Sequence, residues 1–365
     1  MKKWFLAAVL LSITLPAFCC TSIIISGRAT ADGRPLMLKH RDTGELDNAV
    51  GYFQGPKYAF IGLVNAGTAF DGEVWTGTNA AGFSIMNTAS YNIKDDDVPA
   101  SEMDREGILM YRALGICSTL AEFEYYLDTL SRPMGVEANF GVIDAVGGAA
   151  YYEVNNHSWV KFDVNGIPCG YRVVTNFSES GRWADRRGVE RYETATAIFQ
   201  EMLSAKPYKV SAQDIFGQVS RSFRGMEKGA AYVIPRKITS ASIVIEGVKA
   251  GNNPLQTVMW TILGYPPCGV AIPLMVGNGC LLPGEVMPDA NGHALLCDEA
   301  RRRKDSGQDI REICAKTDAE IEDVFMKVYR RWVSGKMNDA VFFSEYAKMK
   351  LSFLKIYRGK FAKNE

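Results

Sequence analysis

Short apolar runs that end in turn residues fill the first three quarters of the chain. Residues 23–25 form a β-branched run, Asp32 and Gly33 are typical of a hairpin turn, and an extended apolar run resumes at Pro35. The same pattern predicts further strands at residues 74–77, 83–86, 140–143, 149–152, 159–162, 172–174, 241–245, 257–263 and 270–274. Because short turns join consecutive strands, the pattern indicates antiparallel sheets.

Apolar residues spaced three or four positions apart predict helices between these strands and near the end of the chain. One such pattern covers residues 108–114, a second covers 123–130, and a third alternates steps of three and one over 321–332. Ser211 and Asp214 resemble the two ends of a capping box, with Asp in place of Glu or Gln. Hairpins interleaved with helices favour an α+β fold over a doubly wound parallel sheet.

Charge and composition exclude several classes of protein. The 365 residues include 41 Lys and Arg and 41 Asp and Glu, so the formal net charge is zero and a strongly basic nucleic-acid binder is excluded. Hydrophobic residues make up 47% and charged residues 22%, which is typical of a globular chain. The basic cluster at residues 301–304 lies among acidic residues, which is typical of a solvated helix face.

The first twenty residues have the features of a secretory signal peptide. Lysines precede an apolar stretch at residues 4–15, and residues 17–19 (A-F-C) form a small-x-small cleavage site. The apolar stretch is shorter than the ~20 residues that a membrane-spanning helix needs. We therefore expect residues 1–19 to direct export, and cleavage after Cys19 to make Cys20 the first residue of the mature chain.

A lipid anchor on a cysteine at the end of the leader is the alternative outcome of processing. Lipoprotein processing favours small residues before the cysteine, so the bulky Phe18 disfavours it at Cys19 and Cys20. Six further cysteines allow fifteen disulfide connectivities, among which the sequence does not choose. No C-x-x-C occurs and the three histidines are scattered, so neither a metal nor an organic cofactor is expected.

A cysteine that becomes the first residue carries a base and a nucleophile together. The unperturbed pKa of an α-amine is about 7.7–8.0 and that of a thiol is about 8.5, so near neutral pH the amine can take the thiol proton. No histidine is needed for this chemistry. The site would still need a carboxylate to orient the ammonium, donors for the developing oxyanion, and a cation that favours the thiolate.

Several segments, in chain order, resemble a known superfamily. They are residues 20–23 (C-T-S-I), 32–36 (D-G-R-P-L), 39–42 (K-H-R-D), 75–83 (W-T-G-T-N-A-A-G-F), 173–176 (V-V-T-N) and 185–187 (D-R-R), with Asn87 one strand after the fourth. Together they resemble the N-terminal-nucleophile (Ntn) hydrolases with a catalytic cysteine. The nearest branch contains acyl-CoA:6-aminopenicillanic-acid acyltransferase, choloylglycine hydrolase, penicillin V acylase and acid ceramidase. The resemblance covers roughly residues 20–275.

The resemblance implies a role for each matching residue. Cys20 would be the nucleophile and, through its amine, the base, while Asp42 would position that amine. Asn176 would donate to the oxyanion, with Asn87 as a second donor or a contact of the amine. The arginine beside the thiolate would be Arg187 or its neighbour Arg186. Solvated positions at the start of a helix are the alternative for these two arginines.

Five further residues are expected on the substrate side. Many members of the branch carry Arg three residues before the Asp, whereas this chain has Lys39 there and Arg41 next to Asp42. Asn79, Phe60 and Tyr91 are the other candidates. A structural role in a turn is the favoured alternative for Asn79. We expect the 43–72 segment to be a loop whose aromatic residues form an apolar acyl pocket. Packing in the core is the alternative for these aromatic residues.

The expected fold is the four-layer αββα sandwich of the Ntn hydrolases, two stacked antiparallel sheets flanked by helices. Residues 20–365 would form one domain, with a helical C-terminal extension over about 285–365. The expected activity is hydrolysis of a linear, non-peptide amide C–N bond through a thioester, with the acyl group passing to water or to another amine. A cysteine-dependent dipeptidase and a lipid-anchored binding protein are the alternatives. The binding partner would be a small-molecule amide substrate, and no nucleic acid is expected. Stable membrane insertion is not expected after the leader is removed. A homo-oligomer is compatible with the sequence.

Overall fold

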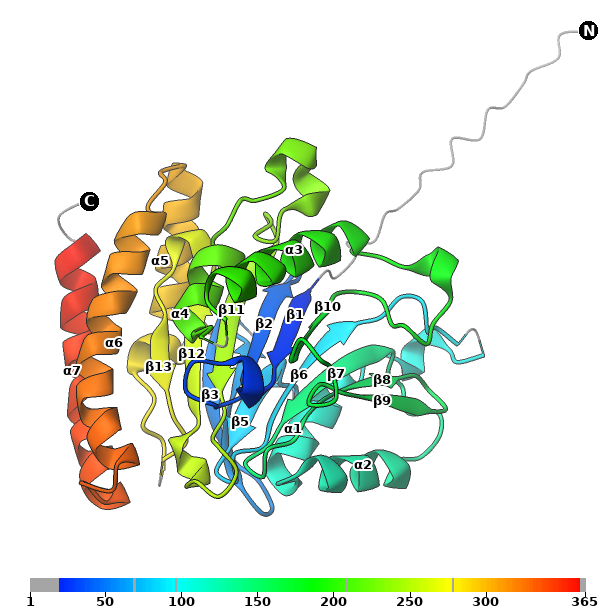
Figure 1. The fold of residues 1–365 in the computed structure, drawn as a ribbon, viewed down its shortest axis with the longest axis horizontal. Helices are drawn as coiled ribbons and strands as arrows, with labels where there is room; N and C mark the ends of the chain where they lie inside the picture. Colours follow the sequence, from blue (N-terminus) through cyan, green and yellow to red (C-terminus); the bar gives the residue numbers. More distant parts are fainter. Residues whose placement is uncertain (1–19, 68–69, 96, 208, 278, 362–365) are drawn as a thin grey trace, which may run out of the picture.

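Two antiparallel sheets stack face to face in this computed structural model, which describes residues 20–67, 70–95, 97–207, 209–277 and 279–361 (Figure 1). The six-stranded sheet has the order β10 (Tyr171–Val174), β1 (Thr21–Ile25), β2 (Leu36–Asp42), β11 (Thr239–Glu246), β12 (Val258–Leu263) and β13 (Ile272–Leu274). The seven-stranded sheet runs in chain order through β3 (Asn48–Gln54), β4 (Ala59–Asn65), β5 (Thr76–Asn79), β6 (Ser84–Ala89), β7 (Ala138–Ile143), β8 (Ala149–Val154) and β9 (Trp159–Asp163).

Helices cover the outer face of each sheet. The helices α1 (Glu106–Ile116) and α2 (Leu120–Thr129) belong to the seven-stranded side, where α1 packs on β4, β5 and β6. On the six-stranded side lie α3 (Val189–Ala205), α4 (Ala212–Ile215), α5 (Leu295–Ser306) and α6 (Arg311–Val333), and α7 (Asp339–Phe361) packs against α6. The layers therefore follow the order α-β-β-α, which confirms the predicted fold class (Figure 1).

The strand β1 lies between β10 and β2 in the six-stranded sheet, and all of its residues are buried. It contacts β6, β7 and β8 of the other sheet, and its residues are buried without alternation, including the polar Thr21 and Ser22. Gly141 in β7 permits the close approach, because a Cβ there would lie 3.1 Å from Cδ1 of Ile24. A hydrogen bond of 3.0 Å between Ser22 Oγ and Tyr151 Oη also joins the sheets.

The segment over 43–72, expected to be a loop, contains the hairpin of β3 and β4. Gly51 of β3 pairs with Gly62 of β4, and these residues interrupt the alternation of apolar and polar positions that marks a strand. The glycine at position 62 leaves room for Val74, whose Cγ1 would lie 2.5 Å from an added Cβ. The prediction of a loop was therefore wrong, because glycines hid the strand pattern.

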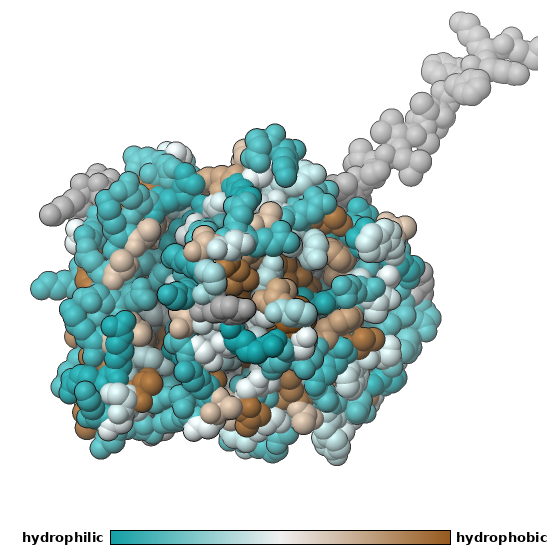
Figure 2. Space-filling model, in the orientation of Figure 1, coloured by the Kyte–Doolittle hydropathy of each residue, from teal (hydrophilic) through white to brown (hydrophobic). Residues whose placement is uncertain are grey.

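The C-terminal helices pack on the six-stranded sheet through an aromatic face. Ile321, Phe325, Tyr329 and Trp332 of α6 are all buried, as their spacing predicts, and the ring of Trp332 stacks on Phe342 of α7 at 3.9 Å. Figure 2 shows a mostly hydrophilic surface over these outer helices.

Within the described residues, no helix has both the length and the apolar character to cross a membrane. The predicted signal peptide, residues 1–19, lies outside the described residues.

Candidate active site

Cys20 lies at the mouth of the β1–β2 hairpin, beside the end of β2. Thr21 pairs with His40 in this hairpin, so the residue that precedes β1 comes next to Asp42, the last residue of β2. Cys20 is 6% exposed, and its Sγ lies 3.9 Å from the backbone oxygen of Asp42. A cavity of about 290 Å³ opens beside it, lined by Cys20, Lys39, Arg41, Asp42, Thr43, Glu45, Asn65, Glu73, Trp75, Asn87, Ala89, Asp104 and Glu106.

Asp42 is a buried carboxylate with one oxygen unused. Its Oδ1 accepts a hydrogen bond of 2.6 Å from Oγ1 of Thr239, whereas its Oδ2 has no hydrogen-bond partner among the described residues. Burial raises the pKa of Asp42 to about 6, and the nearby charge of Arg191 opposes this shift. A buried, unsatisfied carboxylate oxygen is costly, so its surroundings favour a donor at this position.

Lys39 and Asn87 join the two sheets across the cavity. The Nζ of Lys39, on β2, donates to the backbone oxygen of Asn87 and, at 2.9 Å, to its Oδ1 on β6. Since Oδ1 is the acceptor, the amide of Asn87 keeps Nδ2 as its donor end. Burial lowers the pKa of Lys39, and the nearby Cys20 opposes this shift. The Lys39 amine is therefore buried close to the sulfur, and a negative charge on Cys20 favours its protonated form.

Arg41 forms another part of the cavity wall. Its guanidinium donates to Oδ1 of Asn48 and, at 2.8 Å, to Oδ1 of Asn65, and it lies over the ring of Trp75 at 4.7 Å. Burial lowers the pKa of Arg41 to about 10, so the side chain stays charged at neutral pH. These two hydrogen bonds of Arg41 go to neutral amides rather than to carboxylates.

Carboxylates give the same cavity an acidic side. Glu45 and Asp104 are exposed at its edge, Glu73 is half-buried and Glu106 is buried at the start of α1. Burial raises the pKa of Glu73 and raises that of Glu106 to about 7. The cavity therefore presents basic side chains from β2 and, besides Asp42 on β2, carboxylates from the surrounding loops and the start of α1.

Asn176 follows β10 and is fully buried next to Cys20. Its Nδ2 donates 3.0 Å to the backbone oxygen of Ala89, which lines the cavity, and its Oδ1 accepts 2.8 Å from Nη2 of Arg191. The Nη1 of Arg191 donates to the backbone oxygen of Cys20 at 2.5 Å and to Oγ1 of Thr21 at 2.9 Å. Arg191 thus ties the backbone of Cys20 to the side chain of Asn176.

The arginine that contacts Cys20 is Arg191, whereas the sequence pointed to Arg186 or Arg187. Arg186 lies over the ring of Trp183 and donates 3.1 Å to that residue's backbone oxygen. Arg187 has an exposed side chain, although its backbone forms a bridge with Asn176. Both precede α3, and Arg191 lies in its first turn. The buried face of α3, with Ala195, Ile198 and Met202 following Arg191 at helical spacing, is the signal that identifies it.

Asn79, another residue expected on the substrate side, makes hydrogen bonds within the protein. The Nδ2 of Asn79 donates to the backbone oxygens of Leu114 and Cys117, and its Oδ1 accepts from the N–H groups of Ala81 and Phe83. Its amide therefore joins the turn to the end of α1, as the turn alternative implies, and it does not line the cavity at Cys20.

Phe60 likewise belongs to an aromatic cluster away from the cavity lining. It is fully buried, with its ring 5.1 Å from that of Phe53 and 5.2 Å from that of Tyr111. Its position in this structure therefore agrees with the core-packing alternative for Phe60. Tyr91 is half-buried, and its N–H donates 3.3 Å to the backbone oxygen of Asn176.

The other described cysteines and the two candidate metal-binding groups lie outside the cavity lining at Cys20. All seven cysteines among the described residues are free. Two groups of side chains in the described part of the chain could converge on a metal ion: Asp47, His293 and Asp298, and Asp95, Asp97 and His157. Neither group contains a residue that lines the cavity at Cys20.

We expect substitution of Arg191 to lower stability far more than substitution of Arg187. In Arg191→Ala the backbone oxygen of Cys20 and Oδ1 of Asn176 lose their donor, and each buried unsatisfied group costs about 1–3 kcal/mol. Arg187→Ala removes an exposed side chain and should change the unfolding free energy by less than about 0.5 kcal/mol. Urea unfolding of both variants measures the difference, and equal midpoints would contradict this account of Arg191.

Comparison with known proteins gives matches at the level of structure alone. No family model matches the sequence, and no curated protein matches it. Among solved structures, the chain is similar to the N-acylethanolamine-hydrolyzing acid amidase ortholog of Caenorhabditis elegans, with a TM-score of 0.45 and 15% sequence identity. The match covers 62% of this chain and 92% of that chain.

Two bacterial enzymes give comparable values. A variant of the conjugated bile acid hydrolase of Clostridium perfringens has a TM-score of 0.44 and 13% identity, over 70% of this chain and 92% of that one. Penicillin V acylase of Agrobacterium tumefaciens has a TM-score of 0.42 and 14% identity, over 70% of this chain and 86% of that one. With TM-scores below 0.5, the likeness by itself assigns neither a family nor an activity to this chain.

Proposed function

We propose that this protein is a cysteine Ntn hydrolase that cleaves a linear amide C–N bond through a thioester on Cys20. The observation that carries the proposal is the unused Oδ2 of Asp42, a buried carboxylate oxygen beside the residue that leader removal would make the N-terminus. An ammonium group on Cys20 would supply the missing donor and the compensating charge. We further propose that residues 1–19 direct export and are removed, which creates this amine.

In the proposed reaction, the amine of Cys20 takes the proton of its own thiol. The sulfur then attacks the amide carbon, and the electron pair of the carbonyl bond moves to its oxygen. An amide nitrogen carries two N–H bonds, and Asn176 uses one of them on Ala89, so the second can donate to this oxyanion. Nδ2 of Asn87 is the second donor. The buried cations Lys39 and Arg191 favour the thiolate.

Collapse of the oxyanion breaks the C–N bond and leaves the acyl group on sulfur. The Cys20 ammonium gives its proton to the departing nitrogen, which leaves as an amine. Water, or another amine, then attacks the thioester while the Cys20 amine accepts its proton, and the thiolate leaves. Asp42 holds the amine in place through both steps, which is why a carboxylate is needed where no histidine acts. The cavity walls formed by Arg41 and Trp75 would contact the substrate.

Intact-mass spectrometry of the exported chain, before and after mixing with amides, tests the proposal. The panel contains acylated amines, bile-salt conjugates, penicillins and dipeptides, with cationic and anionic members because the cavity carries both charges. We expect a mature chain that begins at unmodified Cys20 and gains one acyl group on that residue. Acid quenching preserves the thioester for peptide mapping.

Each other outcome of this experiment has a definite meaning. Added diacylglyceryl mass on Cys20 would support the lipid-anchored alternative and contradict the enzyme. An acyl adduct formed from dipeptides alone would favour the dipeptidase. Hydrolysis that survives Cys20→Ala undiminished would overturn the nucleophile assignment.

We expect kcat/KM to fall as the pH drops through about 6. Burial raises the pKa of Asp42 to about 6, and only its charged form can hold an ammonium, so its protonation removes the activity that is left after protonation of the free Cys20 amine, whose unperturbed pKa is about 7.7–8.0. The ammonium itself favours the charged carboxylate, which places the acid limb at or below this pH. His40 does not contribute, because burial lowers its pKa to about 3. A pH–rate profile of His40→Gln should therefore keep the limb, and its disappearance in that variant would contradict the assignment.

A further inference from the structure

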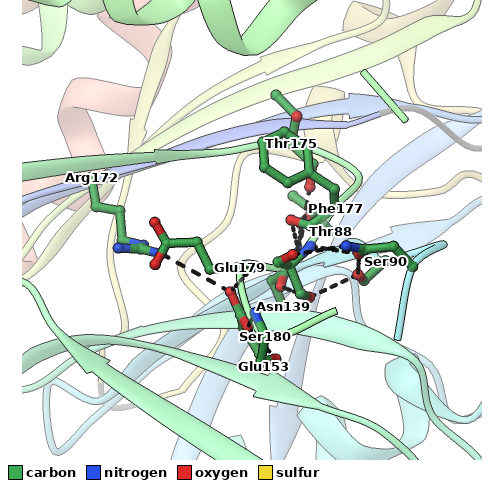
Figure 3. Close-up of polar contacts among 11 residues, drawn as sticks. Thr88, Ser90, Asn139, Glu153, Arg172, Thr175, Phe177, Glu179 and Ser180 are labelled. Atoms are coloured by element: carbon green, nitrogen blue, oxygen red, sulfur yellow. Dashed lines mark hydrogen bonds and ion pairs between the residues drawn. The ribbon is translucent and has the colours of Figure 1, made fainter. Parts of the chain in front are cut away.

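The loop that carries Asn176 is held from the opposite sheet by a row of buried polar side chains (Figure 3). Thr88 on β6 pairs with Asn139 on β7, and Asn139 pairs with Glu153 on β8. All three are at least nine-tenths buried, and they face the segment that follows β10 of the six-stranded sheet. Buried polar groups persist when their hydrogen bonds are complete, and such networks favour one geometry over others.

Asn139 contacts the backbone on both sides of Asn176. Its Nδ2 lies 3.4 Å from the backbone oxygen of Thr175, 3.2 Å from that of Phe177 and 3.1 Å from Oγ1 of Thr88. Its Oδ1 accepts 2.6 Å from Oγ of Ser178. Figure 3 shows these contacts converging on one side chain.

The backbone oxygen of Asn176 itself is held separately, by the N–H of Tyr91 at 3.3 Å. Carbonyls 175, 176 and 177 therefore all have partners, and three consecutive peptide planes are fixed. Because the planes on either side of a residue set its φ and ψ, they also set the direction in which its side chain leaves the backbone. The hydrogen bonds of Asn139 thus orient the amide of Asn176.

Asn92 holds the backbone of the loop immediately after the segment that Asn139 contacts. The N–H of Ser178 donates 2.7 Å to Oδ1 of Asn92, and Nδ2 of Asn92 donates 2.8 Å to the backbone oxygen of Ser178. Oγ of Ser178 also lies 2.7 Å from Oγ of Ser90. Asn92 therefore matches both backbone groups of Ser178, which fixes the register of the loop.

Glu153 anchors the far end of the loop. Its carboxylate accepts from the N–H of Glu179 at 2.7 Å, and from the N–H and Oγ of Ser180 at 2.8 and 2.5 Å. Arg172 forms an ion pair of 2.8 Å with Glu179 and lies 4.0 Å from Glu153, so the carboxylate also has a cation nearby (Figure 3). The loop from Thr175 to Ser180 is thus attached to the seven-stranded sheet at successive residues.

We propose that Asn139 is a positioning residue that sets the donor geometry of Asn176, and so the stabilisation of the oxyanion. The inference rests on the proposed function of Asn176. Cys20 is held through Arg191 and the β1–β2 hairpin, and Asn139 reaches it only through Asn176 and Arg191. Loss of Asn139 should therefore slow catalysis while the reactivity of the sulfur is kept.

The variant Asn139→Leu removes these hydrogen bonds while it keeps a side chain of similar size. We expect kcat to fall about 10- to 100-fold, because small misplacements of a catalytic group have effects of this order. The KM and the rate at which iodoacetamide alkylates Cys20 should stay near their wild-type values. Asn156→Leu is the matched control. Asn156 is a buried asparagine that follows β8, and its Oδ1 accepts a hydrogen bond from the N–H of Gly135. Its substitution should leave the kcat of folded protein unchanged.

Ser178→Ala is the milder variant, which removes the donor to Oδ1 of Asn139 and the contact with Oγ of Ser90 but keeps the other hydrogen bonds of the network. It should lower kcat in the same direction by a smaller factor, and it decides the question if Asn139→Leu does not fold. An unchanged kcat in both variants would overturn the proposal, as would a loss of alkylation rate equal to the loss of kcat. If Cys20→Ala hydrolyses the amides as well as the wild type does, the proposed function itself fails, and this inference fails with it.

Discussion

A chain that begins at Cys20 should hydrolyse its amide substrate about 10² to 10⁴ times faster than the same chain with one alanine added before Cys20. The added residue converts the α-amine into an amide nitrogen, which cannot accept the thiol proton. It also removes the ammonium that we expect beside Oδ2 of Asp42. Both chains keep the thiol, the cavity and the two sheets, so the change isolates the base from the nucleophile.

The measurement compares single-turnover acylation of the two chains at neutral pH. One alanine added after Glu365 is the matched control for the change in length, and it should leave acylation unchanged. Cys20→Ser keeps the amine and replaces the sulfur, and it should also be slow, since a hydroxyl is a much poorer nucleophile at this pH. If the chain with an alanine before Cys20 acylates at the full rate, another group is the base and the proposed mechanism is wrong.

The sequence predicted those parts of the fold whose signals are local. The β1–β2 hairpin, the turn before Gly82 and the aromatic face of α6 each follow from spacing and turn residues within a short window. Gly82 has a φ of +75° in this turn, and an added Cβ would lie 2.9 Å from that of Ala145, so glycine suits the position. The predicted capping box at Ser211 and Asp214 is also confirmed, since both reciprocal hydrogen bonds are present.

The candidate site depends on pairings between distant segments, which no local pattern reports. Lys39 meets Asn87 across the two sheets, and Asn139 meets the loop after β10 although it belongs to the other sheet. In the sequence, each of these residues looks like any other polar residue in a strand, and nothing near it identifies its distant partner. Arg191 is a partial exception, because it occupies an apolar position of a helical repeat, and a charge at such a position predicts a buried partner.

Asn176→Asp should lower kcat by roughly 10² to 10³, the cost of losing one oxyanion donor, which is about 2.7–4 kcal/mol of transition-state stabilisation. The substitution is nearly isosteric, and its remaining oxygen can still accept from Nη2 of Arg191. It removes Nδ2, and with it the N–H that we assign to the oxyanion, and it adds a negative charge where negative charge develops. The KM should change little, because the lost contact forms chiefly in the transition state.

Asn79→Asp is the control that separates this effect from damage to the fold. Asn79 is as buried as Asn176, but its Nδ2 donates to the backbone oxygens of Leu114 and Cys117, away from the cavity lining. Its loss should cost about 1–3 kcal/mol of unfolding free energy for each unpaired group and leave the kcat of folded protein intact. Steady-state kinetics with urea unfolding of both variants tests the pair. Asn176→Asp with wild-type kcat, or an equal loss in Asn79→Asp, would remove Asn176 from the oxyanion site, because an essential donor cannot be replaced by an acceptor without effect.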